Sequence, residues 1–169
     1  MILIIDCGGK STMLKDIRIK SVNDLNTRQV NQLVSILNND EILNQSLGSQ
    51  GKKITSEQFK AKNISWLKNN QAKIFAIMYK SQAIGMISLS HINLKNKKAN
   101  IGYWLTSKYW GKGITTEAFK QILAIAKNDK IKYLSCTIHK DNKSSLGIWQ
   151  AFKAKITQKD GDIIPIIKL

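Results

Sequence analysis

Apolar residues alternate with polar ones in several short stretches of this chain and recur every three or four residues in others. The alternation over residues 17–22 predicts a first strand. The helical spacing that follows predicts a helix capped by Asn23 or Asp24. The apolar side of this helix would carry Leu25, Val30, Leu33, Val34 and Leu37.

The next stretch changes from polar to strongly apolar. Residues 38–53 are polar and contain glycine, so they are predicted to form a long loop. A capping-box sequence that starts at Thr55 opens a second helix. Apolar runs over 73–79 and 83–90 flank a three-residue break and predict a hairpin, and residues 99–106 predict a further strand.

The last third of the chain mixes strand and helix patterns. A loop over 107–113 leads to a helix over 115–126, a strand over 133–138 and a short helix over 142–152. Residues 156–169 predict a closing hairpin with an Asp-Gly turn. The order β-α-α-β-β-β-α-β-α-β-β predicts a mixed α/β (α+β) domain with one antiparallel meander.

Length and composition fit one soluble domain. The 169 residues are 43% hydrophobic and 22% charged, as is ordinary for globular proteins. No apolar run approaches the roughly 20 residues of a membrane span, so no membrane contact is expected. With Cys7 and Cys136 as its two cysteines and no secretion signal, the protein is expected in the cytoplasm. No group of Cys and His has metal-ligand spacing, so no metal is expected.

The net charge of +16 raises the question of nucleic-acid binding. Only Arg18 and Arg28 are arginines among the 27 basic residues. Because arginine is preferred for phosphate and base-edge recognition, a nucleic-acid partner is unlikely. The charge reflects either a general compositional bias or a surface that attracts anions such as the phosphates of a nucleotide.

Residues 101–118 hold the most informative motif. A predicted strand runs into a loop with Gly111 and Gly113, and a helix starts directly afterwards. Glycines let the backbone approach a ligand closely, and the amides of a helix start are unpaired, so the segment suits a pyrophosphate beside Lys112. A plain loop into an amphipathic helix is the alternative. A Rossmann fingerprint is excluded, because Thr116 stands where that motif needs its third glycine.

This segment resembles the acetyl-CoA-binding segment of GNAT N-acetyltransferases, whose general pattern is Gln/Arg-x-x-Gly-x-Gly/Ala. It is most similar to the branch of the ribosomal-protein N-terminal acetyltransferases, where Tyr-Trp-Gly-Lys-Gly followed by Thr-Glu-Ala is common. Trp110 takes the Gln/Arg position, as is usual in that branch, and Thr115 replaces the small residue. Residues 142–145 match the family's Asn-x-x-Ser, although residues 151–154 lack its usual Lys-x-Gly-Phe.

The resemblance covers roughly residues 17–154 and implies the GNAT fold, a twisted, mostly antiparallel mixed sheet that is splayed in the middle and flanked by about four helices. Met13 matches a usual family start, so residues 1–12 are interpreted as a peripheral extension and residues 13–169 as one domain. The implied co-substrate is acetyl-CoA. Its binding residues would be Trp104, Leu105, Thr106, Trp110, Gly111, Lys112, Gly113, Ile114, Thr115, Thr116 and Asn142.

The resemblance also implies direct attack of an amine on the thioester within a ternary complex. Ser145 is then the candidate general acid for the leaving thiolate, with Tyr103 or water as the substitute. His91 is a candidate base, although a lone histidine is more often structural. Asp40 and Glu41 are candidates for docking the amine, with a solvated loop as the alternative.

Several acceptors fit equally well at this point: a protein N-terminus, a polyamine, an amino sugar or an aminoglycoside. The chain is expected to act as a monomer or homodimer. A GNAT-fold module that binds coenzyme A or associates with RNA without turnover is the alternative function.

Overall fold

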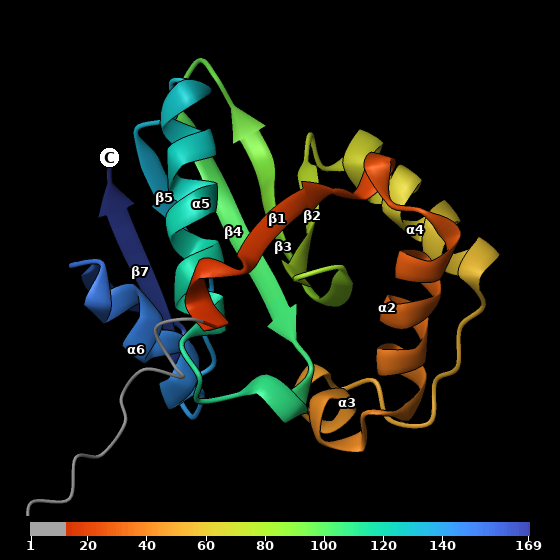
Figure 1. Ribbon diagram of the computed structural model, residues 1–169. Coiled ribbons are helices and arrows are strands. Elements are labelled where there is room, and N and C mark those ends of the chain that lie inside the picture. The colour runs from red at the N-terminus through yellow and green to blue at the C-terminus, as the bar shows by residue number, and fades with distance from the viewer. Residues whose placement is uncertain (1–12) are drawn as a thin grey trace, which may run out of the picture.

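The computed structural model describes residues 13–169, which build a seven-stranded sheet in the order β1-β2-β3-β4-β5-β7-β6 (Figure 1). Neighbouring strands are antiparallel except for β4 and β5, so the predicted mixed, mostly antiparallel sheet is confirmed. The elements in chain order are β1 (Ile17–Ser21), the 3-10 helix η1 (Val22–Asp24), α2 (Thr27–Asn39), α3 (Glu41–Leu47), α4 (Ser56–Asn69), β2 (Lys73–Tyr79), β3 (Gln82–Asn93), β4 (Lys98–Leu105), the 3-10 helix η2 (Ser107–Tyr109), α5 (Ile114–Asn128), β5 (Tyr133–Ser135), α6 (Lys143–Ala151), β6 (Lys155–Lys159) and β7 (Asp162–Lys168).

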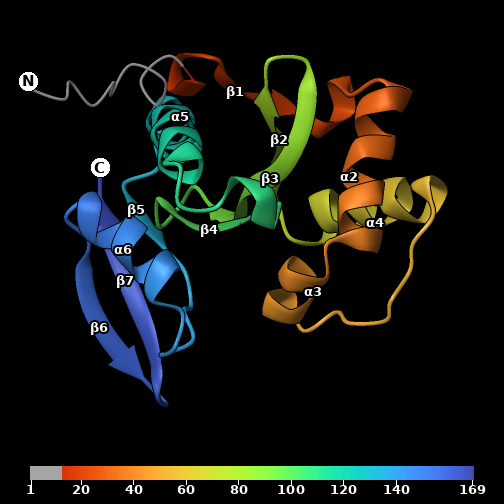
Figure 2. The same cartoon turned by 60° about the horizontal axis from the view of Figure 1, so that its bottom comes forward.

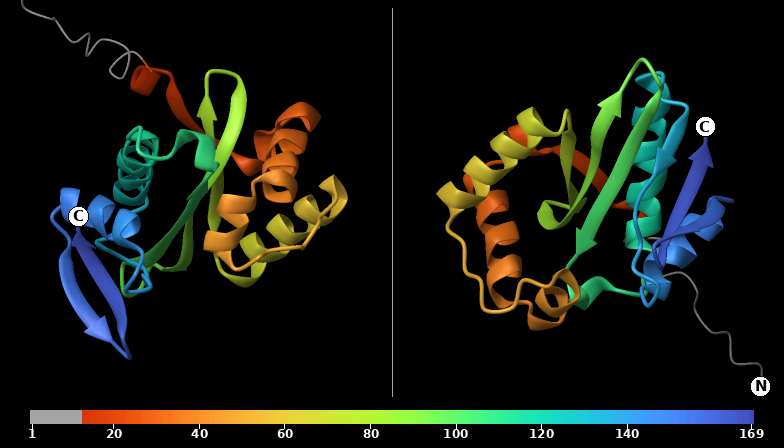
Figure 3. Two further views of the ribbon diagram at one scale, coloured as in Figure 1. Left: turned by 90° about the horizontal axis from the view of Figure 1, so that it is seen from below. Right: turned by 180° about the vertical axis from the view of Figure 1, so that it is seen from behind.

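Helices cover both faces of the sheet, and strand alternation divides the apolar residues between two cores. Along β2, Ile74, Ala76 and Met78 belong to the core under α2 and α4, whereas Ile77 belongs to the core under α5. Successive side chains of a strand point to opposite faces, so one apolar strand serves both cores. Figures 2 and 3 show α2, α3 and α4 on one side of β4, and α5 with α6 on the other.

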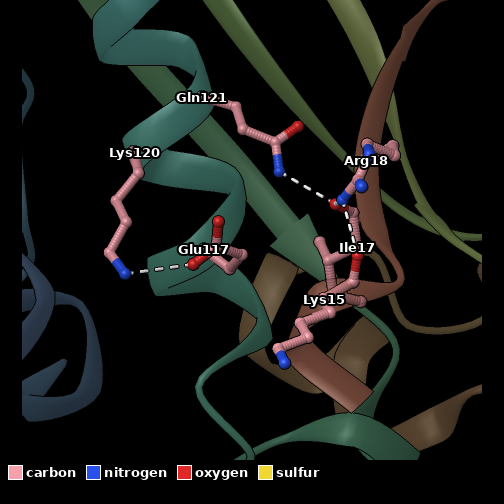
Figure 4. Close-up of polar contacts among 6 residues, drawn as sticks. All are labelled: Lys15, Ile17, Arg18, Glu117, Lys120 and Gln121. Atoms are coloured by element: carbon pink, nitrogen blue, oxygen red, sulfur yellow. Dashed lines mark hydrogen bonds and ion pairs between the residues drawn. The ribbon is translucent and has the colours of Figure 1, made fainter. Parts of the chain in front are cut away.

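Helix α5 is fastened to the edge strand β1 by one side chain (Figure 4). The Nε2 of Gln121 donates to the carbonyl of Ile17 at 2.9 Å, and its Oε1 accepts from the amide of Ile19 at 3.0 Å. The side-chain amide of Gln121 therefore pairs with backbone groups on the outer edge of β1 that a further strand would otherwise satisfy. Glu117 pairs with Lys120 at 3.0 Å on the same helix, in agreement with a structural role for this carboxylate.

The sheet splays where β4 meets β5. The parallel pairing joins only Lys98–Asn100 to Tyr133–Ser135, and the remaining length of β4 has β3 on one edge alone. The predicted strand over residues 133–138 is therefore wrong at its end. After Ser135 the chain leaves β4, and Ile138 instead forms an isolated bridge to Ile163 of β7. The splay expected from the family resemblance is confirmed.

Two predictions about the first helices are wrong. The predicted loop over residues 38–53 contains α3, which begins after Asp40 and ends at Gly48 in the left-handed region. An aspartate cap and a glycine stop bound this short helix, but its seven polar-rich residues hide the helical period. The preceding helix α2 is capped by Asn26 in a capping box, while Asn23 and Asp24 form the 3-10 turn η1.

The chain start lies outside the described residues, so the peripheral extension expected over residues 1–12 stays a prediction, as does the single domain over residues 13–169. Within the described part, no helix is both long enough and apolar enough to span a bilayer.

Candidate functional site

The start of α5 follows the glycine loop that the sequence predicts to bind a pyrophosphate. Gly111 and Gly113 lie in the left-handed region, with φ values of 70° and 79°. Gly113 is the N-cap of α5 and makes no side-chain cap, so the first amides of the helix lack a capping side chain at the positive end of its dipole. Lys112 lies beside them, with its Nζ 5.0 Å from the centre of the Tyr109 ring. Of the other predicted residues here, Ile114 is buried in the core, while Thr115 and Thr116 are half-buried in the first turn.

The end of β4 is held close to β3 so that its free edge faces the splay. Gly85 pairs with Leu105, and a Cβ on Gly85 would come within 2.9 Å of the Leu105 Cα. Only glycine permits this approach. On the other side, the indole Nε1 of exposed Trp110 donates to the carbonyl of Leu105 at 2.7 Å, which fixes the loop that leads to α5.

Asp40 fastens the corner between α2 and α3 to the end of β4. Its Oδ1 accepts from the Leu43 amide at 3.0 Å and the Ser107 hydroxyl at 2.8 Å. Its Oδ2 accepts from the Thr106 hydroxyl and the Ser107 amide, each at 2.7 Å. Burial raises the pKa of Asp40, but these hydrogen bonds outweigh it and hold the pKa below its usual value. The neighbouring Glu41 is exposed in the first turn of α3.

Two predicted proton donors meet across the splay. The hydroxyl of Tyr103 on β4 lies 2.6 Å from the hydroxyl of Ser145 on α6, and either atom can donate. Asn142 caps α6 by accepting from the Ser145 amide at 3.0 Å, so it places Ser145. Burial raises the pKa of Tyr103 to about 12, against the hydrogen bond from Ser145, which lowers it. Tyr103 is therefore protonated at neutral pH.

Two further groups lie beside this pair, and no sequence pattern singles them out. Trp149 is fully buried, and its indole N–H has no hydrogen-bond partner among the described residues, although its approach lowers the pKa of Tyr103. Burial raises the pKa of Cys136 to about 12, so this thiol is protonated at neutral pH. The position of Trp149 on α6 carries no sequence signal of a missing hydrogen-bond partner.

A cavity of about 450 Å³ lies on the opposite side of β4. Tyr103 packs against Phe119 of α5, whereas the next residue, Trp104, packs into the core under α2 and α4. The two hydroxyls of the tyrosine–serine pair thus lie on the α5 side of β4, while Tyr103 also contributes to the wall of the cavity. The cavity is lined by Leu37, Asn44, Leu47, Ser49, Lys52, Ile54, Phe59, Lys62, Asn63, Trp66, Ile74, Met86, Ile87, Ser88, Gly102, Tyr103 and Trp104.

His91 is not brought together with the tyrosine–serine pair. In the register of β3 and β4, Tyr103 pairs with Ile87, four residues before His91, which corresponds to about 13 Å along a strand. The His91 amide donates to the carbonyl of Asn70, and its ring meets the edge of Trp66 at 6.5 Å. These contacts place His91 at the outer end of β3.

A family match agrees with this geometry. Residues 24–155 match the acetyltransferase (GNAT) domain. The chain belongs to the GNAT acetyltransferase family. The matched range includes the end of β4, the start of α5 and the tyrosine–serine pair.

Individual relatives are similar over shorter segments. The ribosomal-protein-serine acetyltransferase of Escherichia coli (strain K12) is 36% identical over 61 residues, which is 36% of this chain and 34% of the relative. YdaF of Bacillus subtilis (strain 168) is 40% identical over 50 residues, 30% of this chain and 27% of that protein. This chain thus spans about a third or less of each curated relative.

Solved structures share the fold over nearly the whole chain. The microcin C7 self-immunity acetyltransferase MccE, in complex with acetyl-CoA and AMP, superposes with a TM-score of 0.74 at 23% identity. The superposition covers 91% of this chain and 93% of that one. At this identity the similarity establishes the fold.

Proposed function

We propose that the protein transfers the acetyl group of acetyl-CoA to a primary amine by direct attack in a ternary complex. The observation that supports this most is the uncapped start of α5 beside the open edge of β4. An anion site and the outer edge of β4 then lie end to end, as a pyrophosphate followed by an extended pantetheine arm requires, although the Leu105 carbonyl on that edge already accepts from Trp110. A relative named as a ribosomal-protein-serine acetyltransferase and a neighbour complexed with acetyl-CoA support the same reaction class.

In this proposal the pyrophosphate binds the amides of the segment from Gly111 to Thr116, with Lys112 as an additional positive charge. The pantetheine arm follows the free edge of β4 from Trp104 to Thr106. Because the Oδ1 of Asn142 is engaged in capping α6, only its Nδ2 remains to bind a pantetheine carbonyl.

Direct transfer forms a bond between the amine nitrogen and the thioester carbon and breaks the carbon–sulfur bond. Holding both reactants beside β4 supplies most of the advantage, since orientation converts a bimolecular step into an internal one. The departing thiolate takes a proton from the Tyr103–Ser145 pair, which lies in the splay and is protonated at neutral pH. The proton of the attacking ammonium leaves through water in the cavity, because His91 lies too far along β3 to take it directly.

The test is acetyl-CoA consumption measured as free thiol across amine classes: an N-terminal peptide, a polyamine, an amino sugar, an aminoglycoside and an amino acid. Thiol release that depends on an added amine is the expected result. The alternative, a module that binds coenzyme A or RNA without turnover, predicts that acetyl-CoA raises the melting temperature while no amine accelerates thiol release.

A further inference from the structure

The cavity on the α4 side of β4 carries positive charge and no negative charge. Lys62 from α4 and Lys52 from the segment between α3 and α4 line it, and both are exposed. Among the described residues that line the cavity, there is no aspartate or glutamate. The cavity is therefore an electrostatically unfavourable environment for an isolated cation and a favourable one for an anion.

These two lysines are available to a ligand. The ion pairs among residues 13–169 lie elsewhere, on Lys73, Lys120 and His139. Glu57, which lies between the two lysines in the sequence, does not line the cavity, and Asp40 already accepts four hydrogen bonds at the end of β4. Asp40 therefore has little capacity left to dock an ammonium group.

The remaining walls are mostly apolar, with Asn44, Ser49, Asn63 and Ser88 as their polar members. Phe59 and Trp66 from α4 face Met86 and Trp104 from the sheet, and the exposed rim includes Leu47 and Trp66. A volume of about 450 Å³ lies within the range of small-molecule sites, about 300–1,000 Å³. The cavity thus suits the apolar body of a small molecule, with the two lysines at one side.

The cavity also reaches the reactive part of β4, because Tyr103, whose hydroxyl pairs with Ser145, is among the residues that line it. A ligand inside can place an amine at β4 and a negative group at the lysines. Building on the proposed acetyl transfer, we infer that the acceptor is a small primary amine that carries a carboxylate or phosphate on an apolar or aromatic body. Polyamines and aminoglycosides, which are polycations, are disfavoured by the same charges.

Matched pairs of acceptors test this inference. Phenylalanine is compared with phenylalaninamide, and tyramine O-phosphate with tyramine, at equal ionic strength. Each pair shares its amine and ring and differs in the anion. We expect kcat/KM to be about 10-fold higher for the anionic member of at least one pair, and the pair that responds tells carboxylate from phosphate. Spermidine should be the poorest acceptor.

The variant Lys52→Gln/Lys62→Gln should lower kcat/KM for the preferred anion about 5- to 10-fold, mainly through KM, because exposed ion pairs each contribute little. The neutral member of the pair should change less than about 2-fold. The matched control is Lys95→Gln/Lys155→Gln, which removes the same charge from exposed positions that do not line the cavity. An equal loss in the control would assign the effect to net charge and overturn the inference.

A binding measurement keeps the inference separate from the proposed reaction. Calorimetric titration of the acetylated compounds, N-acetylphenylalanine against N-acetylphenylalaninamide and O-phosphorylated N-acetyltyramine against N-acetyltyramine, with coenzyme A present, needs no turnover. Tighter binding of at least one anion, abolished by the cavity lysine variant, supports the inference even if no amine is acetylated and the proposed function fails. Equal binding within both pairs would overturn it. So would an acidic N-terminal peptide with a higher kcat/KM than every small acceptor, because the occupant would then be a peptide.

Discussion

The two sides of β4 present different kinds of site. On the α5 side, the site consists mainly of backbone: glycine turns, the first amides of a helix and an unpaired strand edge. On the α4 side, it consists of side chains drawn from α3, α4, β3 and β4. The backbone site occupies one continuous segment, whereas the side-chain site is assembled from residues between Leu37 and Trp104.

This contrast separates what binds a common co-substrate from what selects a partner. Amides and a helix dipole recognise any pyrophosphate, whatever is attached at the far end. Side chains such as Lys52, Lys62 and Trp66 can be exchanged without disturbing the sheet, because they are exposed at the cavity rim. We therefore expect acceptor specificity to reside on the α4 side.

The largest expected effect comes from the backbone site. Replacing Gly111 and Gly113 with valine forces β-branched residues into the left-handed region, at a cost of about 1–3 kcal/mol each. The loop should leave this conformation, and the affinity for acetyl-CoA, measured by calorimetry, should fall at least about 100-fold. Gly161→Val is the control, since Gly161 has a φ of 87° in the distant β6–β7 turn. The control should lose stability but keep affinity. Wild-type affinity in the double variant would refute this site.

The second prediction concerns the rate of the chemical step and not the binding of acetyl-CoA. Ser145→Ala and Tyr103→Phe each remove one hydroxyl of the 2.6 Å pair, so kcat should fall about 100-fold while the Kd for acetyl-CoA stays nearly constant. Because the two hydroxyls act together, the double variant should be little worse than either single one. Tyr133→Phe, on the exposed start of β5, serves as the control. If both single variants turn over at the wild-type rate with chemistry rate-limiting, water is the proton donor.

The smallest effect distinguishes a structural carboxylate from an amine dock. Asp40→Asn should lower the free energy of unfolding by about 1–2 kcal/mol at pH 7, because a helix cap and charge-assisted hydrogen bonds weaken. The folded pKa of Asp40 is lowered, so its stabilisation is present above the ordinary carboxyl pKa and is lost as the pH falls through the folded value. Denaturation at pH 7 and pH 3 should show the variant's deficit shrinking in acid.

Glu41→Gln is the adjacent control, and it should leave stability unchanged. An unchanged stability in Asp40→Asn together with a raised KM for the amine would instead favour the docking role that the sequence suggested.

The same contrast explains what the sequence could predict. Most strands, α5 and the glycine loop follow from local periodicity and from residues adjacent in the chain, so the mixed α/β class was predicted correctly from them, whereas the splay of the sheet was implied by the family resemblance. Helix α3 was missed because seven residues scarcely show a period, although Asp40 and Gly48 bounded it. The contact of Tyr103 with Ser145 joins residues 42 positions apart, and no local pattern encodes that distance.

The cavity was hidden for a different reason. With 27 basic residues in the chain, Lys52 and Lys62 are indistinguishable from the rest until the fold leaves them beside a hollow without a carboxylate. His91 was singled out for its residue type alone, and tertiary placement puts it at the outer end of β3.

The short parallel seam between β4 and β5 has a mechanical consequence. Three residue pairs keep the sheet continuous there, and beyond them Tyr103 meets Ser145 across the splay, while the ring centroid of Phe119 lies 5.1 Å from that of Trp149 and 4.9 Å from that of Phe152. The seam therefore acts as a hinge between the two halves of the sheet, and the packing of Phe119 supports this hinge. A molecule that binds to β4 and β5 together holds both halves of the sheet in place. The amides of β5 and β7 should therefore exchange hydrogen more slowly when such a molecule is bound.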